Sequence, residues 1–250
     1  MQEIDGFNDE LKDKSAGEIL GWAKDRFGAA QAGPASRGAV AFASSLGAED
    51  QVLTHLIRTK FPDIGIFTLD TGRLPEETYD LIQKTMETYG FHYEILYPDL
   101  KELEPLVAEH GPNLFYKSVE LRKACCHARK VVPLQRKLAG LKAWICGLRR
   151  AQSVTRSEIK AVEWDAANGL VKVNPLAAWS EEDVWKYIRE NKVPYNALHD
   201  KGYPSIGCAP CTRAVKPGED VRAGRWWWES PEHKECGLHG RVKSKVERKT

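Results

Sequence analysis

The sequence predicts an α/β fold in which helices flank a doubly wound parallel sheet. Apolar runs of strand length alternate with segments of helical periodicity over most of the chain, a pattern typical of parallel sheets. The 250 residues, of which 42% are hydrophobic and 29% charged, suffice for a sizeable core. We expect one domain over residues 1–250, with the α/β core at about 30–195 and an irregular, loop-rich C-terminal lobe at 196–250.

The elements of the core follow in chain order from hydrophobic spacing and turn residues. Residues 16–28 have helical patterning, and a loop rich in Gly, Pro, Ala and Ser follows at 31–37. Strands and helices are then expected to alternate: strand 38–44, helix 48–60, strand 64–69, helix 75–89, strand 92–97, helical segments to about 140, and strand 143–146. Pro75 suits a first helical turn, where a missing N–H costs no intrahelical bond.

The pattern changes in the last part of the core. Residues 163–175 predict a hairpin with Asn168-Gly169 as its turn. Ser180, with Asp183 three residues later, predicts the N-cap of a further helix. From about Val193 the chain becomes loop-rich.

Composition argues against several functional classes. The N-terminal region is acidic and contains no apolar stretch of membrane-spanning length, so we expect a cytoplasmic protein with no membrane partner. A net charge of +2 does not favour nucleic-acid binding. In a reducing cytoplasm, the six cysteines favour metal binding and thiol catalysis over disulfides.

Two loops mark a candidate anion site. Residues 44–50 (Ser-Ser-Leu-Gly-Ala-Glu-Asp) join the first strand to its helix, where backbone N–H groups and the helix N-terminus attract phosphate. They lack the Gly-Lys-Ser/Thr end of a P-loop, and such a turn can also be purely structural. Residues 69–73 end the second strand at the same sheet edge, where open α/β folds bind ligands. The candidate residues here are Ser44, Ser45, Gly47, Leu69, Asp70, Thr71 and Gly72.

The cysteines fall into three groups. Cys125, Cys126, Cys208 and Cys211 are candidate metal ligands, for which structural zinc and an iron–sulfur cluster both stay open, although an adjacent pair suits a cluster better than one tetrahedral zinc. Cys146, in an apolar strand, is interpreted as a buried residue without a chemical role. Cys236 lies beside Lys234 and His239, which favour a thiolate, and Gly237 permits a bend.

These motifs resemble a known family over most of the chain. The turn at 44–50 resembles the modified PP-loop, and Leu69-Asp70-Thr71-Gly72 the companion motif, of the assimilatory adenylylsulfate and phosphoadenylylsulfate reductases. These belong to the adenine nucleotide α-hydrolase-like superfamily, whose fold is Rossmann-like. The ATP-cleaving relatives carry Ser-Gly-Gly-x-Asp-Ser, which this chain lacks, and Leu46 stands where several of the reductases have serine.

The resemblance implies a cofactor and a reaction. Cys-Cys followed by Cys-x-x-Cys is similar to the 4Fe-4S branch, which acts on adenylylsulfate, and implies one 4Fe-4S cluster on the four paired cysteines. Glu-Cys-Gly-Leu-His matches the family's catalytic motif and implies that Cys236 attacks the substrate sulfur to form an S-sulfocysteine. Reduced thioredoxin, or a similar external dithiol protein, would then release sulfite.

The resemblance also implies which basic residues bind the substrate. Family matches select Lys130, Arg222, Arg225 and His239 as contacts to the anionic groups. Gly147, Arg149 and Arg156 are expected at the sheet edge beside the nucleotide. One tryptophan of the run 226–228 is a candidate for the border of the site or for a thioredoxin-docking face.

Alternatives stay open at this point. A phosphoadenylylsulfate reductase or a dual-substrate enzyme differs from the leading interpretation only in substrate. An iron–sulfur tRNA thiolase lacks support from the ATP-cleaving motif, and a non-catalytic, metal-stapled nucleotide-binding module leaves Cys236 unexplained. A homo-oligomer is compatible with all of these interpretations.

Overall fold

The computed structural model describes residues 2–28, 40–152 and 156–230, and within them a six-stranded sheet forms the centre of the fold. The strand order is β3-β2-β1-β4-β6-β5. The strands are β1 Val40–Ser44, β2 Gly65–Leu69, β3 Glu94–Leu96, β4 Ala143–Ile145, β5 Val162–Asp165 and β6 Leu170–Val173. All neighbours pair in parallel except β5 and β6, which form an antiparallel hairpin. The α/β prediction is confirmed, and the predicted hairpin supplies an antiparallel edge.

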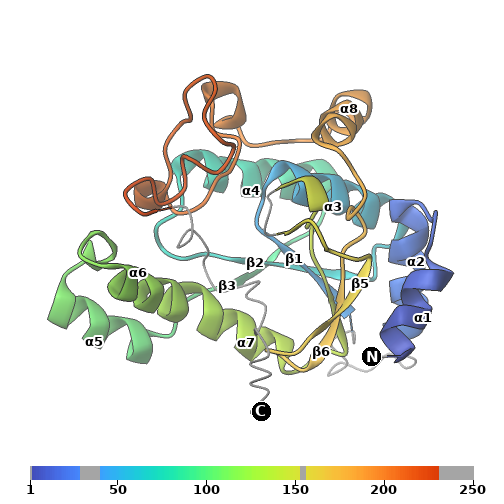
Figure 1. Ribbon diagram of the computed structural model, residues 1–250, viewed down its shortest axis with the longest axis horizontal. Coiled ribbons are helices and arrows are strands. Elements are labelled where there is room, and N and C mark those ends of the chain that lie inside the picture. Colours follow the sequence, from blue (N-terminus) through green and yellow to red (C-terminus); the bar gives the residue numbers. More distant parts are fainter. Residues whose placement is uncertain (1, 29–39, 153–155, 231–250) are drawn as a thin grey trace, which may run out of the picture.

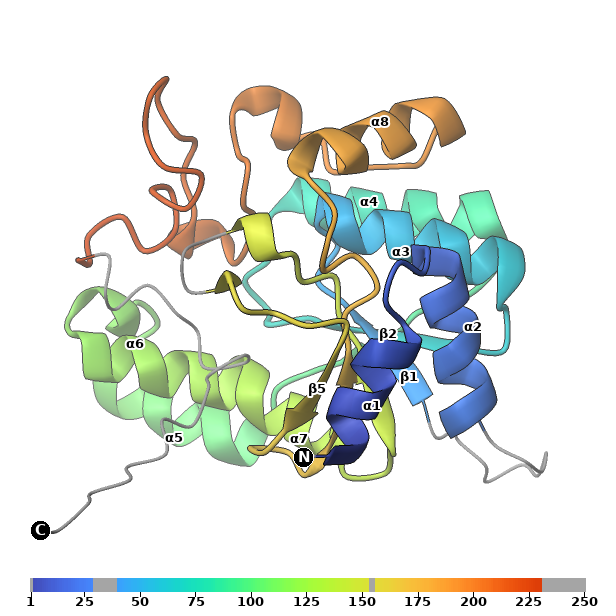
Figure 2. The same cartoon turned by 45° about the vertical axis from the view of Figure 1, so that its right-hand side comes forward.

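Helices cover both faces of this sheet (Figure 1 and Figure 2). They are α1 Gln2–Glu10, α2 Ala16–Phe27, α3 Ala48–Lys60, α4 Glu76–Tyr89, α5 Leu100–His110, α6 Val119–Cys126, α7 Val132–Leu138 and α8 Glu181–Asn191. Helices α2, α3, α4 and α8 share one core cluster with one sheet face, and α7 packs on the other face. No helix in the described ranges is long and apolar enough to cross a membrane.

Alternating side chains divide the core into two layers. On β1, Val40 and Phe42 belong to the layer with α3, whereas Ala41 belongs to the layer with α7. On β4, Ile145 and Trp144 are divided in the same way. Successive strand residues point to opposite faces, so a strand that is apolar at every position is buried on both sides. This explains why the continuous apolar runs correctly predicted the parallel strands.

The observed bounds differ from the predicted ones in detail. The strand expected at 92–97 is only Glu94–Leu96, and Pro75 is the N-cap residue of α4 instead of lying in its first turn. Ser180 caps α8 as expected: its hydroxyl accepts from Asp183 N, and the Asp183 carboxylate accepts from Ser180 N. The stretch up to 140 contains a five-residue π-helix, His127–Val131, between α6 and α7, which no pattern in the sequence indicated.

After α8 the chain forms a lobe of loops and short 3₁₀ turns next to the carboxyl ends of the strands, drawn in orange and red in Figure 2. Hydrogen bonds to the core hold it there. Asn196 donates to Thr78 Oγ1 at 3.0 Å, and Ala209 N donates to the carbonyl of Arg73 at 2.8 Å. The lobe therefore closes over the edge at which the two predicted loops end.

Candidate active site

A cavity of about 300 Å³ lies between the carboxyl edge of the sheet and the C-terminal lobe. Ligand sites of this fold class occur at this edge, and the volume is at the lower end of the usual range for small-molecule sites. Most of the predicted substrate-binding residues line it, namely Ser44, Ser45, Gly47, Leu69, Thr71, Lys130, Gly147, Arg149, Arg156, Arg222 and Arg225. Asp70 and Gly72, also predicted, lie outside its lining.

The loop between β1 and α3 is held by a buried carboxylate. Asp50 Oδ2 accepts hydrogen bonds from Ser45 N and Ser45 Oγ, both at 2.6 Å. Burial raises the pKa of Asp50 to about 6, although the bonds from Ser45 oppose the shift. Leu46 adopts a left-handed conformation (φ 64°) that is unfavourable for a residue with a branched side chain. The loop is thus held by hydrogen bonds at the start of α3, and residues 44–50 line the cavity.

Gly147, after β4, permits that carboxylate to approach. A Cβ atom at position 147 would lie 2.0 Å from Asp50 Oδ1 and 3.3 Å from Glu49 Cβ. No side chain fits there unless the Asp50 carboxylate or the end of β4 moves. The sequence predicts Gly147 beside the nucleotide. The structure adds that the absence of a side chain at this position lets the end of β4 pack closely against the start of α3.

The second loop is stabilised by Asp70. Its Oδ1 accepts from Gly72 N at 2.7 Å and from the Tyr79 hydroxyl at 2.9 Å. Partial burial and the bond to Asp70 raise the pKa of Tyr79 to about 12. Gly72 has φ 68°, so the turn requires the left-handed region. Asp70 and Gly72 therefore shape the loop, while their neighbours Leu69 and Thr71 face the cavity.

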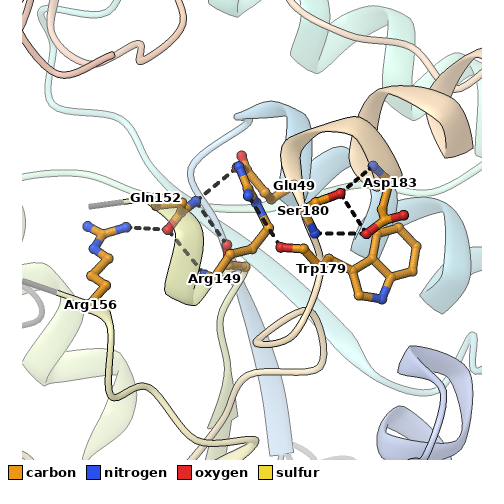
Figure 3. Close-up of polar contacts among 8 residues, drawn as sticks. Glu49, Arg149, Gln152, Arg156, Trp179, Ser180 and Asp183 are labelled. Atoms are coloured by element: carbon orange, nitrogen blue, oxygen red, sulfur yellow. Dashed lines mark hydrogen bonds and ion pairs between the residues drawn. The ribbon is translucent and has the colours of Figure 1, made fainter. Parts of the chain in front are cut away.

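Arg149 and Arg156 belong to a polar network at the rim of the cavity (Figure 3). Arg149 donates from Nε at 2.9 Å and Nη2 at 2.7 Å to Glu49 Oε1, which also accepts from Gln152 at 2.9 Å. Arg156 donates to Gln152 Oε1. Glu49 and Gln152 were missed by sequence reasoning, although Glu49 stands in the motif at 44–50. Arg149 is neutralised by its ion pair and forms part of the wall.

Four cysteines lie together beside this cavity. Cys125 and Cys126 end α6, and Cys208 caps a short 3₁₀ turn that ends at Cys211. All four belong to one buried cluster that also includes Phe115 and Trp226. The five cysteines among the described residues are free thiols. No group of three or more His, Cys, Asp or Glu side chains in the described ranges is arranged to hold a single metal ion.

Charges differ around the four thiols. Burial raises the pKa of Cys211 to about 12, and the neighbouring Cys208 and Cys126 sulfurs add to the shift. Burial also opposes ionisation of Cys208, yet Lys130 and a contact to Thr71 Oγ1 at 3.2 Å hold the Cys208 pKa below its ordinary value. Lys130 therefore acts on both the thiol cluster and the cavity that it lines.

The π-helix explains how two basic residues reach the site. It follows Cys126 directly and contains Arg129 and Lys130. Arg129 is buried and donates to the Thr71 carbonyl at 2.6 Å, which ties the second loop to the cysteine-bearing segment. π-Helical turns occur frequently at functional sites, because the extra residue redirects side chains.

The C-terminal lobe contributes a buried arginine. Arg225 donates to Ser205 Oγ and to the Ile206 carbonyl, both at 3.3 Å, and stacks on Trp226 with 4.7 Å between guanidinium and ring. A Cβ at Gly207 would lie 2.3 Å from Arg225 Nη2, so a side chain at this position would displace the guanidinium. Trp226 is 1% exposed and lines the cavity, whereas Trp227 is 40% exposed.

The predictions for Cys146 and for the two tail residues, Cys236 and His239, differ in outcome. Cys146 is buried as expected, and burial raises its pKa, but it also lines the cavity. Cys236 and His239 lie outside the described residues, so their roles stay predictions.

Comparisons with known proteins agree with this arrangement. A family model described as the phosphoadenosine phosphosulfate reductase domain matches residues 39–214. The adenosine 5′-phosphosulfate reductase of Allochromatium vinosum is 60% identical over 202 residues, which are 81% of this chain and 79% of the relative. The enzyme of that name from Burkholderia cepacia is 59% identical over 200 residues, 80% of each chain.

Solved structures show the same architecture. A phosphoadenylyl-sulfate reductase from Candida auris, crystallised with phosphate, has a TM-score of 0.70 at 28% identity and covers 86% of this chain and 97% of its own. A Candida glabrata FMN adenylyltransferase has a TM-score of 0.52 at 15% identity, with 88% of this chain and 72% of that chain covered, and so shows the fold alone. The chain therefore belongs to the phosphoadenosine phosphosulfate reductase family of oxidoreductases, and the curated relatives that it matches at 59–60% identity are adenosine 5′-phosphosulfate reductases.

Proposed function

We propose that this protein reduces adenylylsulfate to sulfite and AMP in sulfate assimilation, with reduced thioredoxin or a similar dithiol protein as electron donor. The observation that carries the proposal is one cavity with two unlike walls. On one wall, the loop after β1 leads into the N-terminus of α3, where anions are favoured, and Thr71 of the loop after β2 lies beside it. On the other wall, Lys130, Arg222 and Arg225 supply cations beside four buried thiols. A nucleotide with an acidic, sulfur-bearing end suits both walls. The relatives' printed name agrees with this substrate class.

The proposed reaction has two steps at Cys236. The thiolate attacks the sulfur of adenylylsulfate, an S–S bond forms, and the S–O bond to phosphate breaks, with its electron pair leaving on AMP. Fixed cations near that oxygen stabilise the charge that develops there. A thioredoxin thiolate then attacks the Cys236 sulfur and expels sulfite with an electron pair. The second thioredoxin thiol resolves the mixed disulfide, so thioredoxin is oxidised by two electrons.

Four thiols fit the ligand set of a 4Fe-4S cluster. Cys125, Cys126, Cys208 and Cys211 converge from two distant segments without disulfides, and thiolate ligands of this number and burial suit such a cluster. When bound, the cluster would supply a fixed charge that organises the sulfate end of the cavity. Arg129 holds the second loop against the cysteine-bearing segment, and Lys130 links the thiols to the cavity.

A steady-state assay tests the substrate. Sulfite release is measured with reduced thioredoxin and either adenylylsulfate or its 3′-phosphorylated relative. We expect a higher kcat/KM for adenylylsulfate, and a preference for the phosphorylated relative would contradict the substrate assignment. Iron and acid-labile sulfide are measured on anaerobically purified protein. Stoichiometric zinc without sulfide would contradict the cluster assignment.

A further inference from the structure

One carboxylate at the rim of the cavity receives its hydrogen bonds on a single oxygen. Glu49 Oε1 accepts from Arg149 Nε at 2.9 Å, from Arg149 Nη2 at 2.7 Å and from Gln152 Nε2 at 2.9 Å (Figure 3). Among the described residues, every hydrogen bond to the Glu49 side chain ends on Oε1. An ionised carboxylate can accept about four hydrogen bonds, so Oε2 retains acceptor capacity for a ligand.

Glu49 Oε2 lies next to the loop at which a phosphate is expected. A Cβ atom at Gly47, the N-cap residue of α3, would be 3.8 Å from this oxygen. Glu49 itself belongs to the first turn of α3 and lines the cavity, and its side chain is 18% exposed. The ribose of a nucleotide is joined directly to its 5′-phosphate. A phosphate at the start of α3 therefore brings the ribose within reach of Oε2.

The strand order indicates the side on which the ribose lies. Strand β1 lies between β2 and β4. The loop after β2 belongs to the thiol side, since Thr71 Oγ1 contacts Cys208 Sγ at 3.2 Å. Arg149 and Gln152 come from the opposite side, after β4. If the sulfate end of the substrate is at the thiols and its phosphate at the start of α3, we expect the ribose on the side of Glu49.

The positive charge of this network is already paired. The Arg149 side chain is 6% exposed, and it donates to the Trp179 carbonyl at 3.4 Å in addition to its two bonds to Glu49. A phosphate on the ribose 3′ oxygen would thus meet a carboxylate oxygen beside a guanidinium that Glu49 neutralises. Like charges repel strongly in a cavity that is partly shielded from water, whereas a hydroxyl at the same position can donate to the carboxylate.

We propose that Glu49 is a specificity-determining residue, whose Oε2 faces the 3′ position of the bound ribose, accepts a hydrogen bond from a hydroxyl there and excludes a phosphate. The inference rests on the proposed function and adds to it the residue that selects adenylylsulfate over its 3′-phosphorylated relative. Removal of the Glu49 charge should have opposite effects on the two nucleotides. The hydroxyl loses a charged acceptor, while the phosphate loses a repulsive neighbour and gains the unpaired Arg149 as a partner.

The test measures the affinity of cluster-loaded protein for AMP and for adenosine 3′,5′-bisphosphate by calorimetry at fixed salt concentration. The wild type should bind AMP about 10- to 100-fold more tightly than the bisphosphate. Glu49→Gln should bind the bisphosphate about 10-fold more tightly than the wild type does, and its affinity for AMP should stay the same or fall. Damage to the fold lowers both affinities, so it cannot produce this gain.

Glu181→Gln is the matched control. Glu181 lines the same cavity and carries the same charge, but it is exposed in the first turn of α8. Because solvent screens an exposed charge, the ratio of the two affinities should change by less than about twofold in this variant. An equal gain in Glu181→Gln would show that the overall charge of the cavity sets the preference, and would overturn the inference. An unchanged ratio in Glu49→Gln would also overturn it.

If Glu49→Gln does not fold, the double variant Glu49→Gln/Arg149→Met, which leaves no unpaired buried charge, replaces it. In the double variant the preference for AMP over the bisphosphate should fall by about 10-fold, and a preference equal to that of the wild type would overturn the inference. Failure of the proposed function looks different. In that case the wild type itself binds neither nucleotide or prefers the bisphosphate, and the inference fails with it.

Discussion

Gly147→Ala tests whether the contact between the end of β4 and the loop after β1 shapes the proposed nucleotide site. The added methyl group would lie 2.0 Å from Asp50 Oδ1 and 3.1 Å from Asp50 Cγ, so Asp50 or the strand end must move by more than an ångström. Asp50 cannot move and keep both bonds from Ser45, each 2.6 Å long. Overpacking costs about 1–3 kcal/mol of folding stability, and a buried hydrogen bond to a charged group contributes about 1.5–3 kcal/mol.

The assay measures AMP affinity by calorimetry and stability by urea unfolding. The loss of one such hydrogen bond from the loop corresponds to about 10- to 100-fold weaker AMP binding. Gly140→Ala is the matched control, because nothing lies within 4 Å of a Cβ at that position. Asp50→Ala combined with Gly147→Ala removes the overlap and should recover part of the stability. Wild-type AMP affinity and unfolding midpoint in Gly147→Ala would refute the reasoning.

Three further predictions concern the carboxylates and the thiols. The folded-state pKa of Asp50 is raised to about 6, so protonated Asp50 stabilises the fold, and this contribution of about 3 kcal/mol is lost as pH rises from about 4 through 6. The free energy of unfolding of Asp50→Asn, measured in urea, should not decline over this pH range. An equal decline with pH in the wild type and in Asp50→Asn would contradict the prediction. Glu49→Gln leaves the buried Arg149 without its ion-pair partner and should lower the free energy of unfolding by about 3 kcal/mol. The control is Glu77→Gln, which removes an ion pair with the exposed Lys201 and should lower the free energy of unfolding by less than about 1 kcal/mol. Similar losses in the two variants would show that burial of the Arg149–Glu49 pair is unimportant. Cys208→Ala should lose iron and acid-labile sulfide after anaerobic purification, whereas Cys146→Ala should keep both, and retention in both variants would remove Cys208 from the ligand set.

Much of the fold could be predicted because its signals are local. The apolar runs 38–44 and 143–146 and the turn Asn168-Gly169 each carry their own evidence, and the structure has strands and a hairpin there. The grouping of four cysteines could also be predicted from the sequence, because Cys125-Cys126 and Cys208-x-x-Cys211 are short local motifs, and the structure places all four in one buried cluster.

The remaining parts of the site depend on contacts between distant residues. Arg149 meets Glu49 across 100 positions, and Arg122 meets Glu229 across 107. Arginine and glutamate are common residues, so no local sequence pattern predicts which of them form these ion pairs. The role of Gly147 is similar, because a glycine is required there only by the Asp50 carboxylate, which lies in the first turn of α3. The π-helix at 127–131 is likewise not indicated by any local pattern in the sequence.

The account depends most directly on which atom of the protein receives the substrate's sulfur. Cluster-loaded protein is incubated with adenylylsulfate carrying radioactive sulfur, without thioredoxin, and digested for peptide mapping. The account predicts one equivalent of label on the peptide that contains Cys236, release of that label as sulfite when reduced thioredoxin is added, and no label in Cys236→Ser. Label on Cys146 or on a cluster cysteine, or sulfite formation at the normal rate by Cys236→Ser, would contradict it.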